Sequence, residues 1–215
     1  MKSLASLLIQ IAAITPVALA GAGALALSAS AVPMDTITVN FQCQGTPPIG
    51  NPQNMTMTFT VTGDAPASAN PGALVAITLT PAAGSVPATA GGYTINNVHD
   101  MRLMAPYPTN STYVSAELSG GTVAATLDDS DGRIAVHVSD SIRGGSSFTL
   151  PSIIANVTAG ASGAITTTLA GTSYAEPGLT LTANVRTPFG PLDIPVSCYP
   201  DPAPTFTTTT INAQD

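Results

Sequence analysis

Two cysteines are the residues of this chain whose types and positions most clearly point to chemistry. Cys43 lies near the beginning of the chain and Cys198 near its end, and there is no third cysteine. Each stands in a stretch where apolar and polar residues alternate, which is typical of a half-buried strand. In an exported protein such a pair favours a disulfide, and closing a loop of about 155 residues stabilises a fold by at most about 5 kcal/mol. The alternative is two buried free thiols.

The densest group of acids is Asp128, Asp129 and Asp131, followed directly by Gly132. Several carboxylates close together are what a calcium ion binds. The EF-hand pattern does not fit, because aligning Asp129, Asp131 and Gly132 with it puts Leu127 at the first ligand position. An Asp-Gly pair between two apolar stretches is typical of a hairpin turn. The sequence therefore predicts a turn, with a weak calcium site as the alternative.

The two histidines, His99 and His137, are predicted to be structural or surface residues. A zinc site needs three or four ligands, and a disulfide leaves no cysteine to supply one. His99 and Asp100 are neighbours beside or within a predicted strand, so we expect their side chains on opposite faces. The sequence lacks a Gly-x-Ser-x-Gly elbow and a glycine-rich phosphate loop before a helix. We therefore expect no enzyme activity, no catalytic residue and no cofactor.

The first 31 residues are typical of a secretory signal peptide. Lys2 precedes an apolar stretch over 4–27, and Ala29-Ser30-Ala31 gives a cleavage motif before Val32. An uncleaved membrane anchor is the alternative. No later stretch is long and apolar enough to span a bilayer. These features predict a secreted, extracellular protein without a transmembrane span after removal of the signal peptide.

The chain is acidic and carries few charges. Charged residues make up 8% of it, and the formal net charge of −7 becomes −8 when Lys2 is removed. The basic residues that remain are Arg102, Arg133, Arg143 and Arg186. A nucleic-acid-binding protein needs a basic patch to neutralise phosphates. Nucleic acid is therefore excluded as a partner.

Alternating stretches fill the rest of the chain. In residues 36–44, Ile37, Val39, Phe41 and Cys43 share one face. Further stretches of this kind lie at 55–62, 73–80, 93–104, 112–118, 123–127, 134–138, 153–158, 164–169, 179–185, 192–198 and 206–211. Short strands separated by Gly and Pro turns predict an all-β sandwich.

The middle of the chain contains three stretches with a shared turn-and-strand pattern. They are the proline- and glycine-opened stretch 65–79, Pro106 and Pro108 with the following strand and Gly120-Gly121, and residues 142–150. Together they give a resemblance to bacterial immunoglobulin-like surface repeats. It covers about 100 residues and implies an immunoglobulin-like sandwich. The asparagine-rich end of such a repeat is missing.

Four short motifs are spread over the mature chain: Phe41-Gln42-Cys43, the Pro71-Gly72 strand opening, residues 169–174 and Ser197-Cys198-Tyr199-Pro200. With these motifs the mature chain as a whole resembles exported envelope proteins of actinobacteria, of the mycobacterial type, whose activity is unknown. The resemblance implies a place in the cell envelope and brings no catalytic residue with it.

These observations predict two β units. Residues 65–170 form an immunoglobulin-like β-sandwich, and residues 32–64 with 171–215 form a second unit closed by the Cys43–Cys198 bridge. The alternative is a single larger sandwich with the bridge across it.

The function that we expect is that of a secreted structural, adhesive or binding module of the cell envelope, whose partner is an envelope component or another protein. One alternative is a carrier, which would hold a lipid or another apolar ligand in its interior. The second alternative is an envelope hydrolase assembled by the fold.

Overall fold

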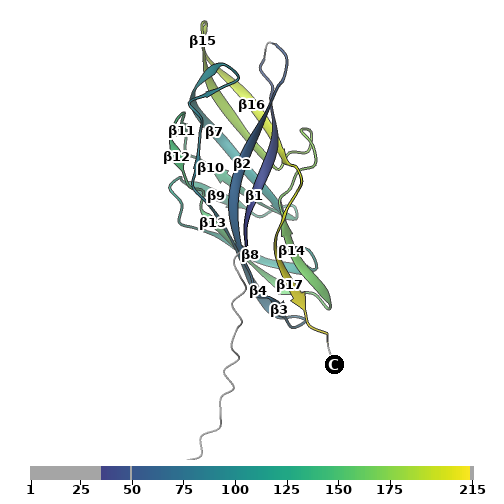
Figure 1. Cartoon of the computed structure of the whole chain (residues 1–215). Coiled ribbons are helices and arrows are strands. Elements are labelled where there is room, and N and C mark those ends of the chain that lie inside the picture. The colour runs from purple at the N-terminus through teal and green to yellow at the C-terminus, as the bar shows by residue number, and fades with distance from the viewer. Residues whose placement is uncertain (1–34, 49, 214–215) are drawn as a thin grey trace, which may run out of the picture.

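The computed structural model describes residues 35–48 and 50–213, and the predicted signal peptide at 1–31 lies outside them. Every regular element in the described part is a strand (Figure 1). In chain order the strands are β1 Asp35–Gly45, β2 Gln53–Asp64, β3 Ser68–Ala69, β4 Leu74–Pro81, β5 Gly84–Ser85, β6 Thr89–Ala90, β7 Tyr93–Pro106, β8 Ser111–Ser119, β9 Ala125–Asp128, β10 Arg133–Val138, β11 Ile142–Arg143, β12 Ser147–Phe148, β13 Ser152–Ala159, β14 Gly163–Thr168, β15 Leu179–Thr187, β16 Gly190–Pro200 and β17 Thr205–Ile211.

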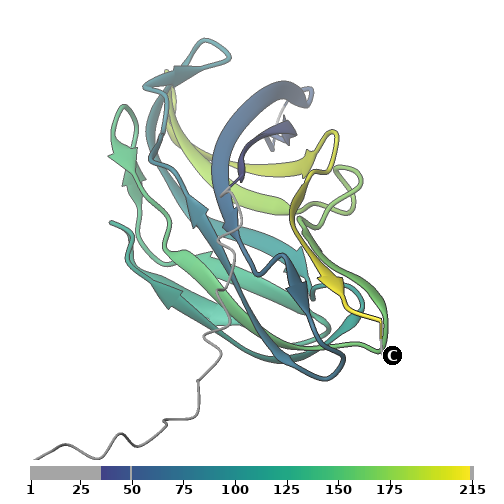
Figure 2. The same cartoon turned by 60° about the horizontal axis from the view of Figure 1, so that its bottom comes forward.

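One twelve-stranded antiparallel sheet contains most of these strands. Its order is β8-β13-β4-β2-β1-β16-β15-β7-β10-β9, and β6 and β11 also pair with β7. The remaining strands form a β14-β17-β3 sheet and a β12-β5 pair, and the β17–β3 pairing alone is parallel. Figure 2 shows that the strands curve around a common interior. The predicted all-β sandwich fold class is confirmed.

The alternation that the sequence predicts in β1 and β2 is the alternation that the structure has. Val39, Phe41 and Cys43 are buried, and the residues between them face outward. Because each inward residue of β1 lies opposite an inward residue of β2, as Phe41 lies opposite Met57, the pairing brings apolar side chains together on one face. They pack with buried residues of β7, β15 and β16 in the largest of three apolar clusters.

The disulfide joins Cys43 and Cys198, as predicted. The two residues are direct cross-strand partners in β1 and β16, with Cα atoms 4.0 Å apart, and both are fully buried in the largest apolar cluster. The bridge therefore links neighbouring strands of one sheet and does not cross from one sheet to another. It fixes a pairing between strands that are 155 residues apart in the sequence.

The main sheet draws strands from both predicted units. Its order runs from β8, β13 and β4 of residues 65–170, through β2, β1, β16 and β15 of the terminal segments, and back to β7, β10 and β9. The division into two units stays a prediction, which limited proteolysis under non-reducing conditions tests. Survival of a fragment near 65–170 would support it. Loss of all structure after the first cut would support a single unit, and the shared sheet favours this second outcome.

Candidate functional site

The disulfide is buried among apolar side chains. Both cysteines of the chain are in the bridge, which leaves no free thiol. Neither cysteine is exposed, and the neighbours opposite them on β2 and β15 are Met55 and Leu179. A reactive disulfide needs access to an attacking thiolate. The burial of this bridge therefore assigns it to the stability of the sheet.

The predicted turn between β9 and β10 is a type I′ hairpin turn. Asp131 and Gly132 have φ angles of 56° and 74°, and the amide of Arg133 donates to the carbonyl oxygen of Ser130 at 3.3 Å. Positive φ at both central residues defines this turn type and explains the Asp-Gly pair. The hairpin that the sequence predicts around residues 128–132 is confirmed by the pairing of β9 with β10.

The acids of this turn have protein partners. Arg102 donates to Oδ2 of Asp128 at 2.7 Å, and the Ser130 hydroxyl donates to Oδ1 at 2.7 Å. The hydrogen bonds from Ser130 lower the pKa of Asp128, and the Arg102 charge adds to the effect. The hydroxyl of Tyr113 donates to Oδ2 of Asp129 at 2.7 Å.

Two stacked tyrosines hold this turn against β8. The rings of Tyr107 and Tyr113 have centroids 4.1 Å apart, and the Tyr107 hydroxyl donates to the Asp129 carbonyl oxygen. Partial burial raises the pKa of Tyr113, and its hydrogen bond to Asp129 raises it further. Within residues 35–48 and 50–213, no group of three or more His, Cys, Asp or Glu side chains is arranged to hold a metal. The three aspartates are therefore not gathered into one ligand set, and a weak calcium site stays the alternative prediction for this turn.

His99 and Asp100 meet, which corrects the expectation that they point to opposite faces. Nδ1 of His99 lies 2.8 Å from Oδ2 of Asp100. The reason is an extra residue in β7: Thr182 of β15 faces His99, whereas Thr180 faces Arg102, and Asp100 has a φ of 51°. Such a β-bulge breaks the alternation of the strand locally and re-aims a side chain.

His99 belongs to a polar network across β7, β15 and β16. Its Nε2 lies 3.5 Å from Oδ1 of Asp193, and this oxygen accepts a 2.6 Å hydrogen bond from Asn184. Asn96 in turn donates to Asn184 at 2.8 Å. Partial burial lowers the pKa of His99, but the hydrogen bonds and charges of Asp100 and Asp193 raise it by more, so the net shift is upward. Both ring nitrogens face carboxylates. His137 lies elsewhere, opposite Arg102 on β10.

A continuous row of polar side chains crosses five strands of the main sheet beside this network. Asn54, Gln44, Ser197, Thr180 and Arg102 are successive cross-strand partners on β2, β1, β16, β15 and β7. Gln44 donates to Asn54 at 3.0 Å. In the neighbouring row on one side, Gln42 lies between Thr56 and Tyr199, and Tyr199 meets Tyr174 edge to face at 5.1 Å. In the row on the other side, Thr182 lies between Pro195 and His99.

We call the polar, uncharged outward residues of these rows, together with the next outward pair on β1 and β2, the polar face. They alternate with the buried residues of the same strands and are half-buried or exposed. The polar face consists of Asn40, Gln42, Gln44, Asn54, Thr56, Thr58, Thr180, Thr182, Ser197 and Tyr199. It presents amide and hydroxyl groups to solvent from β2, β1, β16 and β15. The buried disulfide joins the two middle strands of these four, β1 and β16. Sequence alternation predicts the part of the polar face on β1 and β2, but the row across β16 and β15 depends on a strand order that alternation does not contain.

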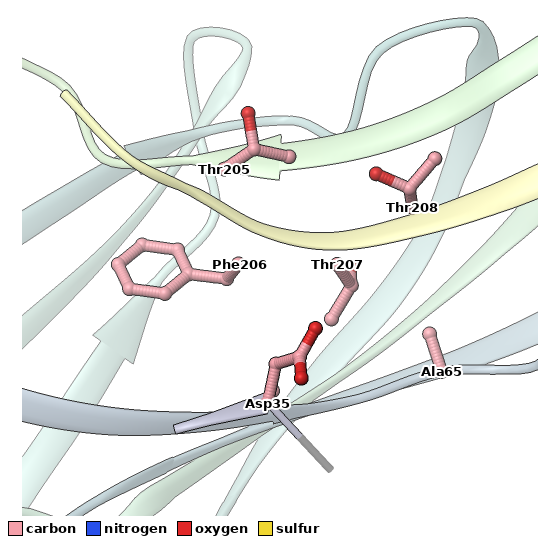
Figure 3. A pocket seen from close by; sticks show the side chains of 7 residues that line it. Asp35, Ala65, Thr205, Phe206, Thr207 and Thr208 are labelled. Atoms are coloured by element: carbon pink, nitrogen blue, oxygen red, sulfur yellow. The ribbon is translucent and has the colours of Figure 1, made fainter. Parts of the chain in front are cut away.

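Two hollows occur elsewhere. One, of about 200 Å³, is lined by Asp35, Gly63, Ala65 and residues 205–208 of β17 (Figure 3). The other is apolar, lies between Ile77, Ala105 and Ile153, and measures about 20 Å³. The apolar hollow has room for about one water molecule, whereas pockets for small ligands measure about 300–1,000 Å³. Neither hollow has the size and lining that an acyl chain would need. No helix among the described residues is long and apolar enough to cross a membrane.

Comparison with known proteins gives a likeness of fold. No protein-family model and no curated protein matches the chain, so the resemblance to immunoglobulin-like repeats is not confirmed. Among solved structures, the chain is similar to a protein of the actinobacterium Corynebacterium diphtheriae that is described as membrane anchored, with a TM-score of 0.51 and 18% identity. The match covers 84% of this chain and 38% of the other, so this chain spans well under half of that protein's length. At this identity the likeness shows the fold alone.

Proposed function

We propose that the chain is an extracytoplasmic, non-catalytic binding or adhesive module of the cell envelope, and that the polar face is its binding surface. The disulfide supports an extracytoplasmic location, because such bridges form and persist in oxidising compartments. The actinobacterial source of the similar structure, and the membrane anchor in its description, are compatible with an envelope location.

The polar face is the observation that carries the proposal. Amide and hydroxyl side chains offer both donors and acceptors, as Gln44 and Thr180 do on either side of Ser197 in the row. Uncharged groups of this kind match a hydroxyl-rich, uncharged envelope polymer better than a charged one. The disulfide adds to this by holding β1 and β16 together, so that the surface is preformed and less freedom is lost on binding.

The histidine network favours a role without catalysis. A histidine that acts as general base needs one ring nitrogen facing the proton that it removes. In His99, Nδ1 faces Asp100 and Nε2 faces Asp193, so both nitrogens already have carboxylate neighbours. This arrangement suits a cross-strand contact between β7 and β16 better than it suits activation of a hydroxyl.

Binding to insoluble, lipid-extracted envelope fragments of an actinobacterium tests the proposal. We expect the purified protein to sediment with the fragments, and the double change Gln44→Ala with Thr180→Ala to weaken binding about tenfold by removing two hydrogen-bonding groups. The matched control is Thr208→Ala with Thr210→Ala, at exposed positions of β17 outside the polar face. Equal binding by both double variants would contradict the assignment of the face. Soluble products that accumulate with the wild type and not with His99→Gln would instead support the hydrolase alternative.

A further inference from the structure

The hairpin between β15 and β16 ends in a fully exposed phenylalanine. Phe189 has a relative exposure of 101%, and Pro188 beside it is also exposed. The turn is nevertheless ordered by its own hydrogen bonds: the Thr187 hydroxyl donates to the Gly190 carbonyl oxygen at 2.7 Å and accepts from the Phe189 amide at 3.2 Å. The aromatic ring is thus held out on a formed turn with little contact to the rest of the chain.

A second aromatic residue lies next to this turn. Thr94 of β7 pairs with Arg186 of β15, which brings the beginning of β7 beside the end of the β15–β16 hairpin. Tyr93, the first residue of β7, is 45% exposed. We call Tyr93, Arg186, Pro188 and Phe189 the aromatic tip. In Figure 1 the tip lies at the end of the molecule away from the C-terminus.

The aromatic tip is also where the charge of this acidic chain changes sign. Across the segments 86–98 and 185–192, which form this end of β7, β15 and β16, Arg186 is the one charged residue. The next charged residue along β16 is Asp193, whose carboxylate faces His99 and Asn184. Arg186 is exposed. In a chain with a net charge of −7, this leaves a small positive, aromatic end.

The shape of the aromatic tip favours binding to a lipid surface over binding to a flat protein surface. A stable protein interface buries about 800 Å² on each partner, whereas the tip offers one protruding ring and a half-exposed neighbour. A protruding ring can instead enter the boundary between lipid headgroups and acyl chains, where aromatic side chains are enriched. An arginine close to the ring is attracted to anionic headgroups.

We propose that the aromatic tip inserts into a lipid surface that contains anionic headgroups. Phe189 enters the acyl boundary, and Tyr93 and Arg186 lie at the level of the headgroups. The acidic remainder of the chain is repelled by the same surface, so the module is oriented with this end toward the lipid. This inference is independent of the polar face, because the lipid contacts lie at the hairpin end and not on the outer rows of β1, β2, β15 and β16.

The chain offers a clean optical test, since it contains no tryptophan. Phe189→Trp places a single indole at the tip of the disulfide-bonded protein. Leu74→Trp is the control: the side chain of Leu74 is 67% exposed, and β4, which begins at this residue, lies near the opposite end of the molecule (Figure 1). With vesicles of phosphatidylcholine and phosphatidylglycerol, we expect the emission of the Phe189→Trp protein to shift to shorter wavelength and that of the Leu74→Trp protein to stay unchanged. A shift in neither protein, or an equal shift in both, would overturn the proposal.

Sedimentation with the same vesicles tests the two side chains separately in an otherwise unchanged chain. We expect Phe189→Ser to weaken binding about tenfold or more, because a phenylalanine side chain no longer leaves water. We expect Arg186→Gln to abolish the increase of binding with phosphatidylglycerol content, because only the repulsion of the acidic remainder is then left. Wild-type binding by Phe189→Ser, or equal binding of the wild type to vesicles of phosphatidylcholine alone, would contradict the insertion and the headgroup contact respectively. Both changes lie on exposed side chains, and equal melting temperatures would verify that the variants are folded.

Discussion

The main sheet joins distant parts of the chain in two different ways. At its centre, β1 and β16 are joined by a buried disulfide among apolar side chains. Toward its ends, the turn between β9 and β10 is joined to β7 and β8 by Arg102, Tyr107 and Tyr113, whose partners are the exposed groups of Asp128 and Asp129. The centre depends on a covalent bond and on burial. The margin depends on hydrogen bonds and charges in contact with solvent, so we expect a substitution of one polar group there to cost less free energy of unfolding than opening the bridge does.

The largest effect is expected from opening the bridge at the centre. Replacing both cysteines, as Cys43→Ala with Cys198→Ala, should lower the free energy of unfolding by about 3 to 5 kcal/mol, because the unfolded chain regains the freedom of a loop of 155 residues. Urea unfolding of the wild type in the presence of a reductant is the matched measurement, and it should give a loss of similar size. A loss below about 1 kcal/mol in both experiments would mean that burial alone holds β1 to β16.

A smaller effect is expected at the margin from Tyr113→Phe. The change removes the hydrogen bond to Asp129 but keeps the ring that stacks on Tyr107, so we expect a loss of about 1 kcal/mol in urea unfolding. The control is Tyr174→Phe in the other aromatic pair, which keeps the edge-to-face contact with Tyr199. If the two variants unfold alike, the Tyr113 hydroxyl does not brace the turn.

The histidine network should give a pH dependence with two limits of opposite sign. The pKa of His99 is raised above its ordinary value of 6.5, so its contribution to stability is complete below that pH and is lost as the pH rises through the folded value. The pKa of Asp193 is lowered below 3.8, chiefly by the hydrogen bond from Asn184, so its contribution is complete above that pH and is lost as the pH falls through the folded value.

NMR titration of the His99 ring measures the upper limit directly. Asp193→Asn should lower the pKa of His99, because it replaces a carboxylate by a neutral amide. Asp100→Asn serves as the comparison for the second carboxylate neighbour. An unchanged His99 titration in both variants would remove the carboxylates as the cause of the shift.

The smallest effect is expected from calcium. Asp128 and Asp129 already accept hydrogen bonds from Arg102, Ser130 and Tyr113, which an ion would have to replace. We expect added calcium to change the melting temperature by no more than the same concentration of magnesium does. A shift specific to calcium that disappears in Asp129→Ala would establish the metal site that the sequence leaves open.

The parts of the fold that follow from sequence are those in which one strand carries its own pattern. The inward positions of β1 are visible because alternation needs only the strand itself, and the Asp-Gly turn is visible because positive φ selects such residues. The Cys43–Cys198 pairing supplied the one long-range neighbour that could be predicted. Strands of two residues, such as β3, β5 and β6, are too short to show an alternation.

The parts that do not follow depend on which strands become neighbours. Nothing in the residues of β15 shows that they lie between β16 and β7, so neither the polar row through Thr180 nor the contact of His99 with Asp193 could be predicted. The bulge at Asp100 depends on the register between β7 and β15, which also lies outside any local pattern. The candidate surface was therefore visible from sequence only on β1 and β2.

The position of the bridge also has a consequence for how the chain is made. Synthesis proceeds from the amino-terminal end, so Cys43 emerges 155 residues ahead of the partner with which it shares the sheet. Until β16 arrives, the middle strand of the sheet has an open side and a free thiol that any oxidant or foreign thiol could reach. Native oxidation is therefore one of the last events in maturation, and the oxidised Cys43–Cys198 pair identifies molecules in which almost the entire chain has already reached its place.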